Sequence, residues 1–197
     1  MSRAVFLDRD GVVNRAIAGP EGLDSPRSVH EFQLLPGAAR AIRRLNDLQV
    51  PVVLVSNQPG IAKGKFAARD LDAITERMRA ELNQESAVLD GIYYCLHHPE
   101  AVLAEYRVAC DCRKPKPGLL VRAAREMGLT LAGSYMLGDQ ARDMVAGKSA
   151  GCTTVFIGSR STAAGPIESD YFCDDLSAAV TLLVALENAD QLSQTRR

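Results

Sequence analysis

The sequence predicts an α/β fold, a three-layer Rossmann-like arrangement in which a mainly parallel sheet carries helices on both faces. Short apolar runs alternate along the chain with amphipathic segments in which apolar residues recur at spacings of three and four. Strands that alternate with helices at this interval form parallel sheets through right-handed crossovers. Most of the apolar runs end in a polar turn, so we expect these turns to meet at one edge of the sheet, where ligands bind in such folds.

Each predicted strand is one of the apolar runs. The five predicted strands span residues 3–7, 50–55, 91–95, 134–137 and 153–157. Proline and glycine mark several helix ends, with Pro36 and Pro117 before two of the helices and Gly128 and Gly151 after two. The predicted helices span residues 38–48, 71–82, 120–127, 141–150 and 176–186. Residues 15–27 and 159–169 are predicted as loops.

Composition excludes several classes of protein. The 197 residues are 47% hydrophobic and 24% charged, with a formal net charge of −1, which is unlike collagen-like, disordered or disulfide-scaffold chains. The flat charge balance predicts neither nucleic acid nor a membrane surface as a partner, and no apolar run approaches the ~20 residues of a membrane span. We expect a cytoplasmic monomer with one domain over residues 1–190 and a frayed tail over residues 191–197.

Carboxylates gather at the predicted strand ends. Asp8 and Asp10 follow the first strand with one residue between them, and Asp139 follows the fourth. Carboxylates that converge on one edge repel each other unless a cation lies among them, and hard oxygen ligands suit Mg²⁺. Ser56 offers a hydroxyl and Lys114 a positive charge, so the set has the parts of a phosphoryl-transfer site. Taken singly, each residue fits an ordinary turn, cap or surface pair better, and it is their joint appearance at strand ends that favours the site.

The cysteines indicate a second metal site. Cys95, His97, Cys110 and Cys112 supply three thiolates and an imidazole, a set that closes a tetrahedral Zn²⁺ site. The alternative is a group of buried or reactive thiols, because the two pairs are more loosely spaced than in common zinc motifs. A zinc ion here would be structural: it would order the zinc loop, residues 95–112, and fix Arg113 and Lys114 directly after it.

Four segments together resemble the motifs of the haloacid dehalogenase (HAD) superfamily of phosphatases. They are Phe-Leu-Asp-Arg-Asp-Gly-Val at 6–12, Val-Ser-Asn at 55–57, Arg-Lys-Pro at 113–115, and Gly-Asp at 138–139 followed by Asp143. The resemblance implies that Asp8 is the nucleophile and Asp10 the proton donor and acceptor, and that Ser56 and Lys114 stabilise the transferred group. It also implies Mg²⁺ held by Asp8, Asp10 through its backbone carbonyl, and Asp139, with Asp143 supporting the site from behind.

The cysteine motifs followed at once by Arg-Lys-Pro resemble a narrower branch, the histidinol-phosphatase-like group, which has little or no cap domain. Within it the long gap between the cysteine pairs favours members that remove the 7-phosphate of a heptose 1,7-bisphosphate over those that act on histidinol phosphate. The implied substrate-binding residues are Arg9, Ser56, Asn57, Gln58, Arg113, Lys114 and Gln140. Gln140 stands where many members have Lys, and residues 15–26 lack the expected substrate loop.

Two alternatives from other classes are a phosphate-storing receiver domain and a zinc-stabilised binding module without catalysis. Receivers carry adjacent acids after their first strand and the phosphoacceptor after the third, whereas Asp8 and Asp10 alternate here. A non-catalytic module would be expected to lack part of the carboxylate, hydroxyl and lysine set, and every part of it is present. Both alternatives are therefore disfavoured.

Overall fold

The computed structural model describes the backbone of residues 2–19, 22–159 and 167–195, and side chains as far as residue 188. It contains a six-stranded sheet with the order β5-β4-β1-β6-β7-β8. All neighbouring strands in this sheet are parallel. The strands are β1 (Val5–Leu7), β4 (Val52–Asn57), β5 (Gly91–Cys95), β6 (Tyr135–Gly138), β7 (Thr153–Ile157) and β8 (Tyr171–Cys173). The predicted parallel Rossmann-like sheet is confirmed, and β8 extends it by an edge strand that the sequence analysis did not predict.

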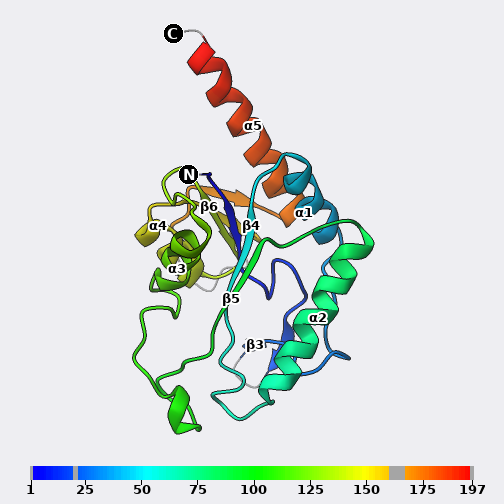
Figure 1. Cartoon of the computed structure of the whole chain (residues 1–197), viewed down its shortest axis with the longest axis vertical. Coiled ribbons are helices and arrows are strands. Elements are labelled where there is room, and N and C mark those ends of the chain that lie inside the picture. Colours follow the sequence, from blue (N-terminus) through cyan, green and yellow to red (C-terminus); the bar gives the residue numbers. More distant parts are fainter. Residues whose placement is uncertain (1, 20–21, 160–166, 196–197) are drawn as a thin grey trace.

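Helices cover both faces of the sheet, as Figure 1 shows. One face carries α1 (Ala38–Asp47), α2 (Ala68–Gln84) and α5 (Leu176–Thr195), and the other carries α3 (Gly118–Met127) and α4 (Ala141–Ala150). Alternate residues of β1 face opposite sides: Val5 and Leu7 belong to the apolar core under α1, α2 and α5, whereas Phe6 belongs to the core under α3 and α4. Because all strands of the sheet are parallel, their carboxyl ends lie at one edge of the sheet.

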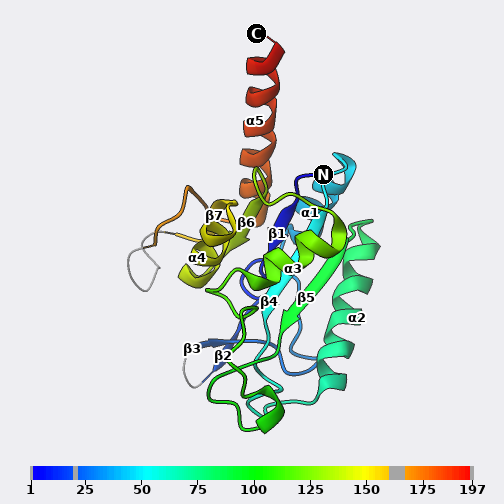
Figure 2. The ribbon, with the colours of Figure 1, turned by 60° about the vertical axis from the view of Figure 1, so that its left-hand side comes forward.

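Two excursions of the chain extend beyond the carboxyl ends of the strands (Figure 2). One is an antiparallel pair, β2 (Ile17–Gly19) and β3 (Gly22–Asp24), within a segment predicted as loop. The other is the zinc loop, whose middle forms a single short 3-10 turn, η1 (Ala104–Tyr106). Each strand of the pair has three residues and none is fully buried, so neither shows the apolar alternation by which strands are recognised in a sequence.

The last helix differs from its prediction. The sequence analysis ended it at residue 186 and expected a frayed tail over residues 191–197, but α5 is helical through Thr195. Its first half packs on the sheet and on α1, and its second half projects away from the body (Figures 1 and 2). Residues 187–195 contain few apolar residues, so the apolar pattern that predicts the helix ends before them. Part of the predicted loop over residues 159–169 lies outside the described residues.

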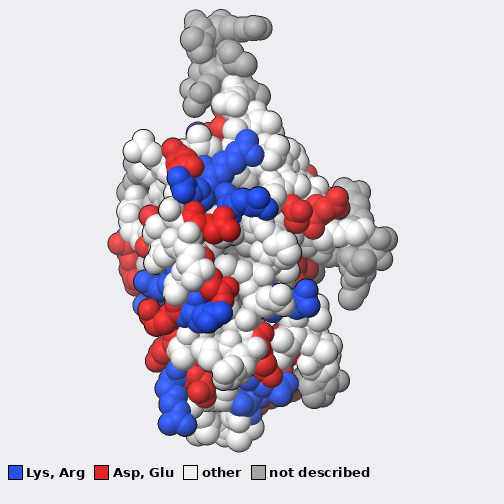
Figure 3. All heavy atoms as spheres, turned by 90° about the vertical axis from the view of Figure 1, so that its right-hand side faces the viewer, with Lys and Arg blue, Asp and Glu red and all other residues white. Residues whose placement is uncertain are grey.

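Charged side chains of both signs lie on the described surface. On the face drawn in Figure 3, Lys and Arg lie interspersed with Asp and Glu rather than in one field of a single sign. In the described part of the chain, no helix combines the length and apolar character that crossing a membrane requires.

Candidate active site and metal cluster

A crevice of about 1260 Å³ opens at the carboxyl ends of the strands. Residues that follow β1, β4 and β6 line it, and so do residues of the β2–β3 pair and of the zinc loop. From the predicted site, the lining residues are Asp8, Asp10, Ser56, Asn57, Arg113, Asp139 and Gln140. The topology therefore brings side chains that are far apart in the sequence to the position where ligands bind in open α/β sheets.

Asp8 lies at the floor of the crevice beside a buried lysine. Lys114 Nζ lies 3.0 Å from Asp8 Oδ1 and 2.7 Å from Asp143 Oδ1, and the three side chains are at most 6% exposed. Burial alone would raise the pKa of Asp8, but the charge of Lys114 and a hydrogen bond from Ser56 lower it below its usual value. Asp8 is therefore kept as an ionised carboxylate, the form that a nucleophile needs.

Asp139 completes a group of three carboxylates. One oxygen each from Asp8, Asp139 and Asp143 lie within 4.8 Å of one another. Burial, with the charges of Asp8 and Asp143, raises the pKa of Asp139 to about 7, and Asp139 Oδ1 is buried without a hydrogen-bond partner among the described residues. Three carboxylates beside one lysine leave an excess of negative charge. Hard oxygen donors in this state fit a divalent cation such as Mg²⁺.

Gly11 allows Asp139 to lie close to the turn that follows β1. Its φ is +83°, and a Cβ built on it would lie 2.0 Å from Asp139 Oδ2. Any side chain at residue 11 would displace Asp139, so the glycine of the Asp-Arg-Asp-Gly segment allows the turn after β1 to reach the end of β6.

Asp10 lies in the same crevice but in a different set of contacts. Its carboxylate accepts hydrogen bonds from the side chains of Arg9, Asn14, Ser25 and Gln58. The sequence analysis placed Arg9 and Gln58 against the substrate, but both side chains are 0% exposed and neither lines the crevice. Both side chains are buried and hydrogen-bond to Asp10. They also contact each other, because Arg9 Nη2 donates to Gln58 Oε1 at 2.9 Å. Their side chains therefore hold Asp10 in position.

The remaining predicted residues are fixed by local contacts. Asn57 forms a reciprocal pair with the backbone of Lys114, because its Oδ1 accepts from Lys114 N and its Nδ2 donates to Lys114 O, each at 3.0 Å. This pair joins the end of β4 to the turn before α3. Arg113 is half-buried and donates to the backbone oxygen of His97 at 3.2 Å, and Gln140 Nε2 donates to Asp139 Oδ2 at 3.2 Å.

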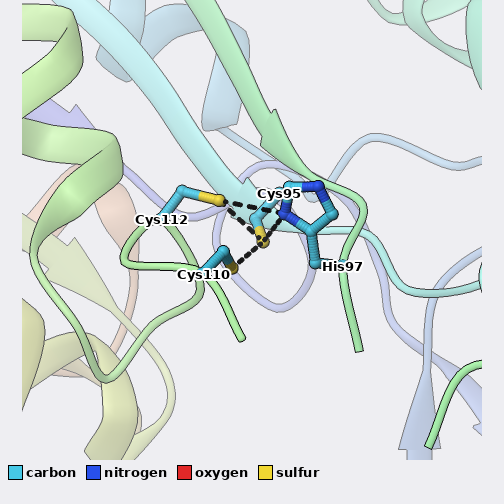
Figure 4. Close-up of side chains that lie close together, drawn as sticks. All are labelled: Cys95, His97, Cys110 and Cys112. Atoms are coloured by element: carbon cyan, nitrogen blue, oxygen red, sulfur yellow. Dashed lines mark hydrogen bonds between the residues drawn. The ribbon is translucent and has the colours of Figure 1, made fainter. Parts of the chain in front are cut away.

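The four residues of the predicted zinc set point toward one another (Figure 4). Cys95 Sγ lies 3.2 Å from Cys112 Sγ and 3.7 Å from Cys110 Sγ, and His97 Nδ1 lies 3.4 Å from Cys112 Sγ and 4.0 Å from Cys95 Sγ. Ligands bound to a tetrahedral zinc ion at about 2.0–2.3 Å are separated by roughly 3.5–3.8 Å. The observed separations bracket these values, so the cluster has the donor atoms and the size for such an ion.

The thiols of this cluster differ in acidity. Burial and contact with Cys112 raise the pKa of Cys95. Burial opposes ionisation of Cys110 as well, but hydrogen bonds from Cys112 and His97 outweigh it and lower the pKa of Cys110 to about 7. One thiolate therefore forms near neutral pH beside two thiols, and a bound cation would favour ionisation of all three.

Sequence reasoning missed several residues that line the crevice. Asp24 ends β3 and Ser25 follows it, and Asp24 forms an ion pair with Lys65 from the segment before α2. Ser25 Oγ donates to Asp10 Oδ2 at 2.7 Å. Arg142, in the first turn of α4, also lines the crevice. The Gly-Pro-Glu-Gly segment at 19–22 was the available signal for a turn, but nothing local showed that the turn would face the strand ends.

Comparison with known proteins defines the class first. A family model described as HAD-hydrolase-like matches residues 111–179. A crystal structure of D,D-heptose 1,7-bisphosphate phosphatase from B. bronchiseptica, complexed with magnesium and phosphate, aligns with a TM-score of 0.79 and 35% identity, covering 93% of this chain and 98% of that one. Together with the parallel sheet and the strand-end carboxylates, these matches define a phosphatase of the HAD type.

Curated relatives narrow the class to one family. The D-glycero-β-D-manno-heptose-1,7-bisphosphate 7-phosphatase of Yersinia pestis is 39% identical over 177 residues, which is 88% of this chain and 91% of the relative. The protein of the same name from Escherichia coli (strain K12) is 40% identical over 151 residues, covering 77% of this chain and 76% of the relative. The chain belongs to the family of D-glycero-β-D-manno-heptose-1,7-bisphosphate 7-phosphatases.

Proposed function

We propose that this enzyme removes the 7-phosphate of D-glycero-β-D-manno-heptose 1,7-bisphosphate through a phosphoryl group carried on Asp8. The observation that carries the mechanism is the ionised carboxylate of Asp8, held by Lys114 at 3.0 Å at the floor of a polar crevice. The substrate follows from membership in the family, since the relatives with this name span most of the chain.

Two steps account for hydrolysis. In the first, an oxygen of Asp8 attacks phosphorus, the bond from phosphorus to the sugar oxygen breaks, and Asp10 gives that oxygen its proton. In the second, Asp10 takes a proton from water, the water oxygen attacks phosphorus, and the bond to Asp8 breaks to release phosphate. Ser56 Oγ and Lys114 Nζ both contact Asp8, so they are positioned to stabilise the negative charge that moves during both steps.

The contacts of Asp10 support its part in this scheme. Four side chains hold its carboxylate, and one of them, Ser25, comes from the turn after β3. A group that transfers a proton in both directions must keep one position through both steps. Arg9 and Gln58 supply that rigidity from below, where they are fully buried.

We also propose that the carboxylates hold Mg²⁺, with Asp8, Asp139 and the backbone carbonyl of Asp10 as ligands. The unpartnered Oδ1 of Asp139 and the raised pKa of that carboxyl are the features that support a cation here. When bound, the ion neutralises negative charge on the phosphoryl oxygens and orients them. Asp143 holds Lys114 at 2.7 Å and so acts on the reaction through that lysine.

For the second metal we propose a structural Zn²⁺ bound by Cys95, His97, Cys110 and Cys112. The separations between the four donor atoms fit a tetrahedral ion. The cluster lies at the base of the zinc loop, and Arg113 follows its last ligand and hydrogen-bonds the backbone of His97. The zinc ion would therefore fix the direction in which Arg113 enters the crevice.

The remaining proposals concern substrate contacts and the protein as a whole. Ser56, Asn57, Arg113 and Gln140 line the crevice, so they are positioned to contact the sugar or its phosphates. We propose a cytoplasmic monomer with one domain over residues 1–190, because residues of a single chain supply every part of this site and because free thiols suit a reducing compartment.

A substrate comparison tests the proposed function. Phosphate release is measured from both anomers of heptose 1,7-bisphosphate, from histidinol phosphate and from simple sugar monophosphates, with the Asp8→Asn variant as the inactive control. We expect the highest kcat/KM with the β-anomer of the bisphosphate. A preference for histidinol phosphate, or equally weak turnover of every substrate, would contradict the proposal, and full activity of the Asp8→Asn variant would contradict the mechanism.

A further inference from the structure

Arg142 is a cation of the crevice wall for which the proposed mechanism has no use. It is exposed, lies in the first turn of α4 and lines the same crevice as Asp8 and Ser56. Within the described part of the chain its guanidinium takes part in no hydrogen bond and no ion pair. By contrast, Lys65, which also lines the crevice, is paired with Asp24.

The position of residue 142 in its helix does not favour a cation. The first turn of a helix carries partial positive charge, which disfavours Arg there by about 0.3–1 kcal/mol. The neighbouring Asp143 does fit this position, because its Oδ2 accepts a hydrogen bond from Gln140 N at 3.0 Å. A residue that opposes the preference of its own helix while facing a crevice is the kind of conflict expected at a binding site.

Arg113 also lines this crevice, and it is half-buried directly after Cys112. Two guanidinium groups that line one crevice repel each other, because both carry a positive charge. An anion with more than one charge placed between them would remove the repulsion, and a phosphate group matches the planar fork of a guanidinium.

The position of Arg142 suits the phosphate that does not react. The phosphate that reacts must lie against Asp8, which is only 4% exposed and already has Lys114 beside it. Arg142 is exposed at the rim of the crevice. Gln140, the other polar residue that opens α4, is neutral and its amide is bound to Asp139. Arg142 is therefore the residue of this turn with a positive charge available to a group outside the reacting centre.

We propose that Arg142, together with Arg113, binds the phosphate that the enzyme does not remove, and that Arg142 thereby sets the preference for a bisphosphate over a monophosphate. This inference rests on the proposed function, because it assumes a substrate with two phosphates. It assigns Arg142 to substrate binding and leaves the two chemical steps to Asp8 and Asp10.

The test compares two substrates that differ only in the second phosphate. The kinetic constants kcat and KM are measured for heptose 1,7-bisphosphate and heptose 7-phosphate with the wild-type enzyme, Arg142→Gln and Arg142→Lys. Removing one charged hydrogen-bonding partner is expected to lower kcat/KM for the bisphosphate by roughly 10- to 100-fold, mainly through KM. The constants for the monophosphate are expected to stay unchanged, and Arg142→Lys is expected to lie between the wild type and Arg142→Gln.

Lys148→Gln is the matched control, because Lys148 is an exposed cation of the same helix that does not line the crevice. An equal loss on both substrates with Arg142→Gln, or no loss on the bisphosphate, would overturn the inference. If the wild type hydrolyses a different sugar bisphosphate, the substrate proposal fails, and the same comparison on that bisphosphate and its monophosphate still decides the role of Arg142. A wild type that acts on monophosphates alone would overturn both.

Discussion

Lys114→Met is the substitution whose effect on stability follows most directly from the structure. Lys114 is the cation that Asp8 and Asp143 share, at 3.0 and 2.7 Å, with all three side chains at most 6% exposed. Removing one partner of a buried ion pair leaves the other as an uncompensated charge and lowers the free energy of unfolding by about 3–5 kcal/mol. We expect a loss of this size at mildly alkaline pH in the absence of Mg²⁺.

The loss should depend on pH in a defined direction. Without the lysine, burial raises the pKa values of Asp8 and Asp143 above those in the unfolded chain. The folded variant then binds more protons than the unfolded chain between the unfolded and the folded pKa. Its stability falls as the pH rises across this window, by about 1.4 kcal/mol for each pH unit and each extra proton, and levels off above the folded pKa. We expect full destabilisation at about pH 8 and a clearly smaller one at about pH 5.5.

Urea unfolding of the wild type, Lys114→Met and Lys116→Met at both pH values measures these differences. Lys116 is the matched control because its ion pair with Asp111 lies at the surface, with side chains 55% and 94% exposed, and such pairs contribute about 0–1 kcal/mol. The reasoning is refuted if Lys114→Met is as stable as Lys116→Met at the higher pH, or if its loss of stability is the same at both.

Three further predictions concern the two metal sites. Gly11→Ala should abolish Mg²⁺-dependent activity because its Cβ would lie 2.0 Å from Asp139 Oδ2, whereas Gly64→Ala, also at positive φ but with nothing within 4 Å, should keep it; retained activity in Gly11→Ala would contradict this. Because the pKa of Asp139 is raised to about 7, the Mg²⁺ concentration for half-maximal activity should be roughly 10-fold higher at about pH 6 than at about pH 8, and a flat profile would argue against Asp139 as a ligand. Cys112→Ser should lose bound zinc, measured by elemental analysis, and expose the zinc loop to proteolysis, whereas Cys173→Ser, a thiol outside the cluster, should do neither; equal zinc content in both would contradict the assignment.

Most of the sheet could be predicted from the sequence because its central strands, β1, β4, β6 and β7, are largely buried on both faces. The predicted strands at 91–95 and 153–157 match β5 and β7 at both ends, since both runs are rich in β-branched and aromatic residues, which favour strands. The β2–β3 pair could not be predicted in the same way. Its strands have three residues each with exposed or half-buried side chains, so their pairing depends on the turn and on contacts such as that between Asp24 and Lys65.

The candidate site also contains residues that could be predicted from the sequence and residues that could not. Asp8, Asp139 and Ser56 could be anticipated because each follows a strand, and the topology alone brings strand ends together. The side chain of Arg9 could not be placed, because its burial depends on Asp10 and Gln58 as hydrogen-bond partners. No pattern in the sequence distinguishes a cation that faces a crevice from one that is buried to hold a neighbouring carboxylate.

The measurement that tests the central claim most directly is a search for a phosphoryl group on Asp8 during turnover. The enzyme is mixed with heptose 1,7-bisphosphate and Mg²⁺ and quenched in acid, and the peptide that contains residue 8 is examined by mass spectrometry. We predict one phosphoryl group on Asp8 in the wild type and none on residue 8 in the Asp8→Asn variant, which lacks the nucleophile. Turnover without any phosphoryl group on Asp8, or a phosphoryl group on another residue, would contradict the account.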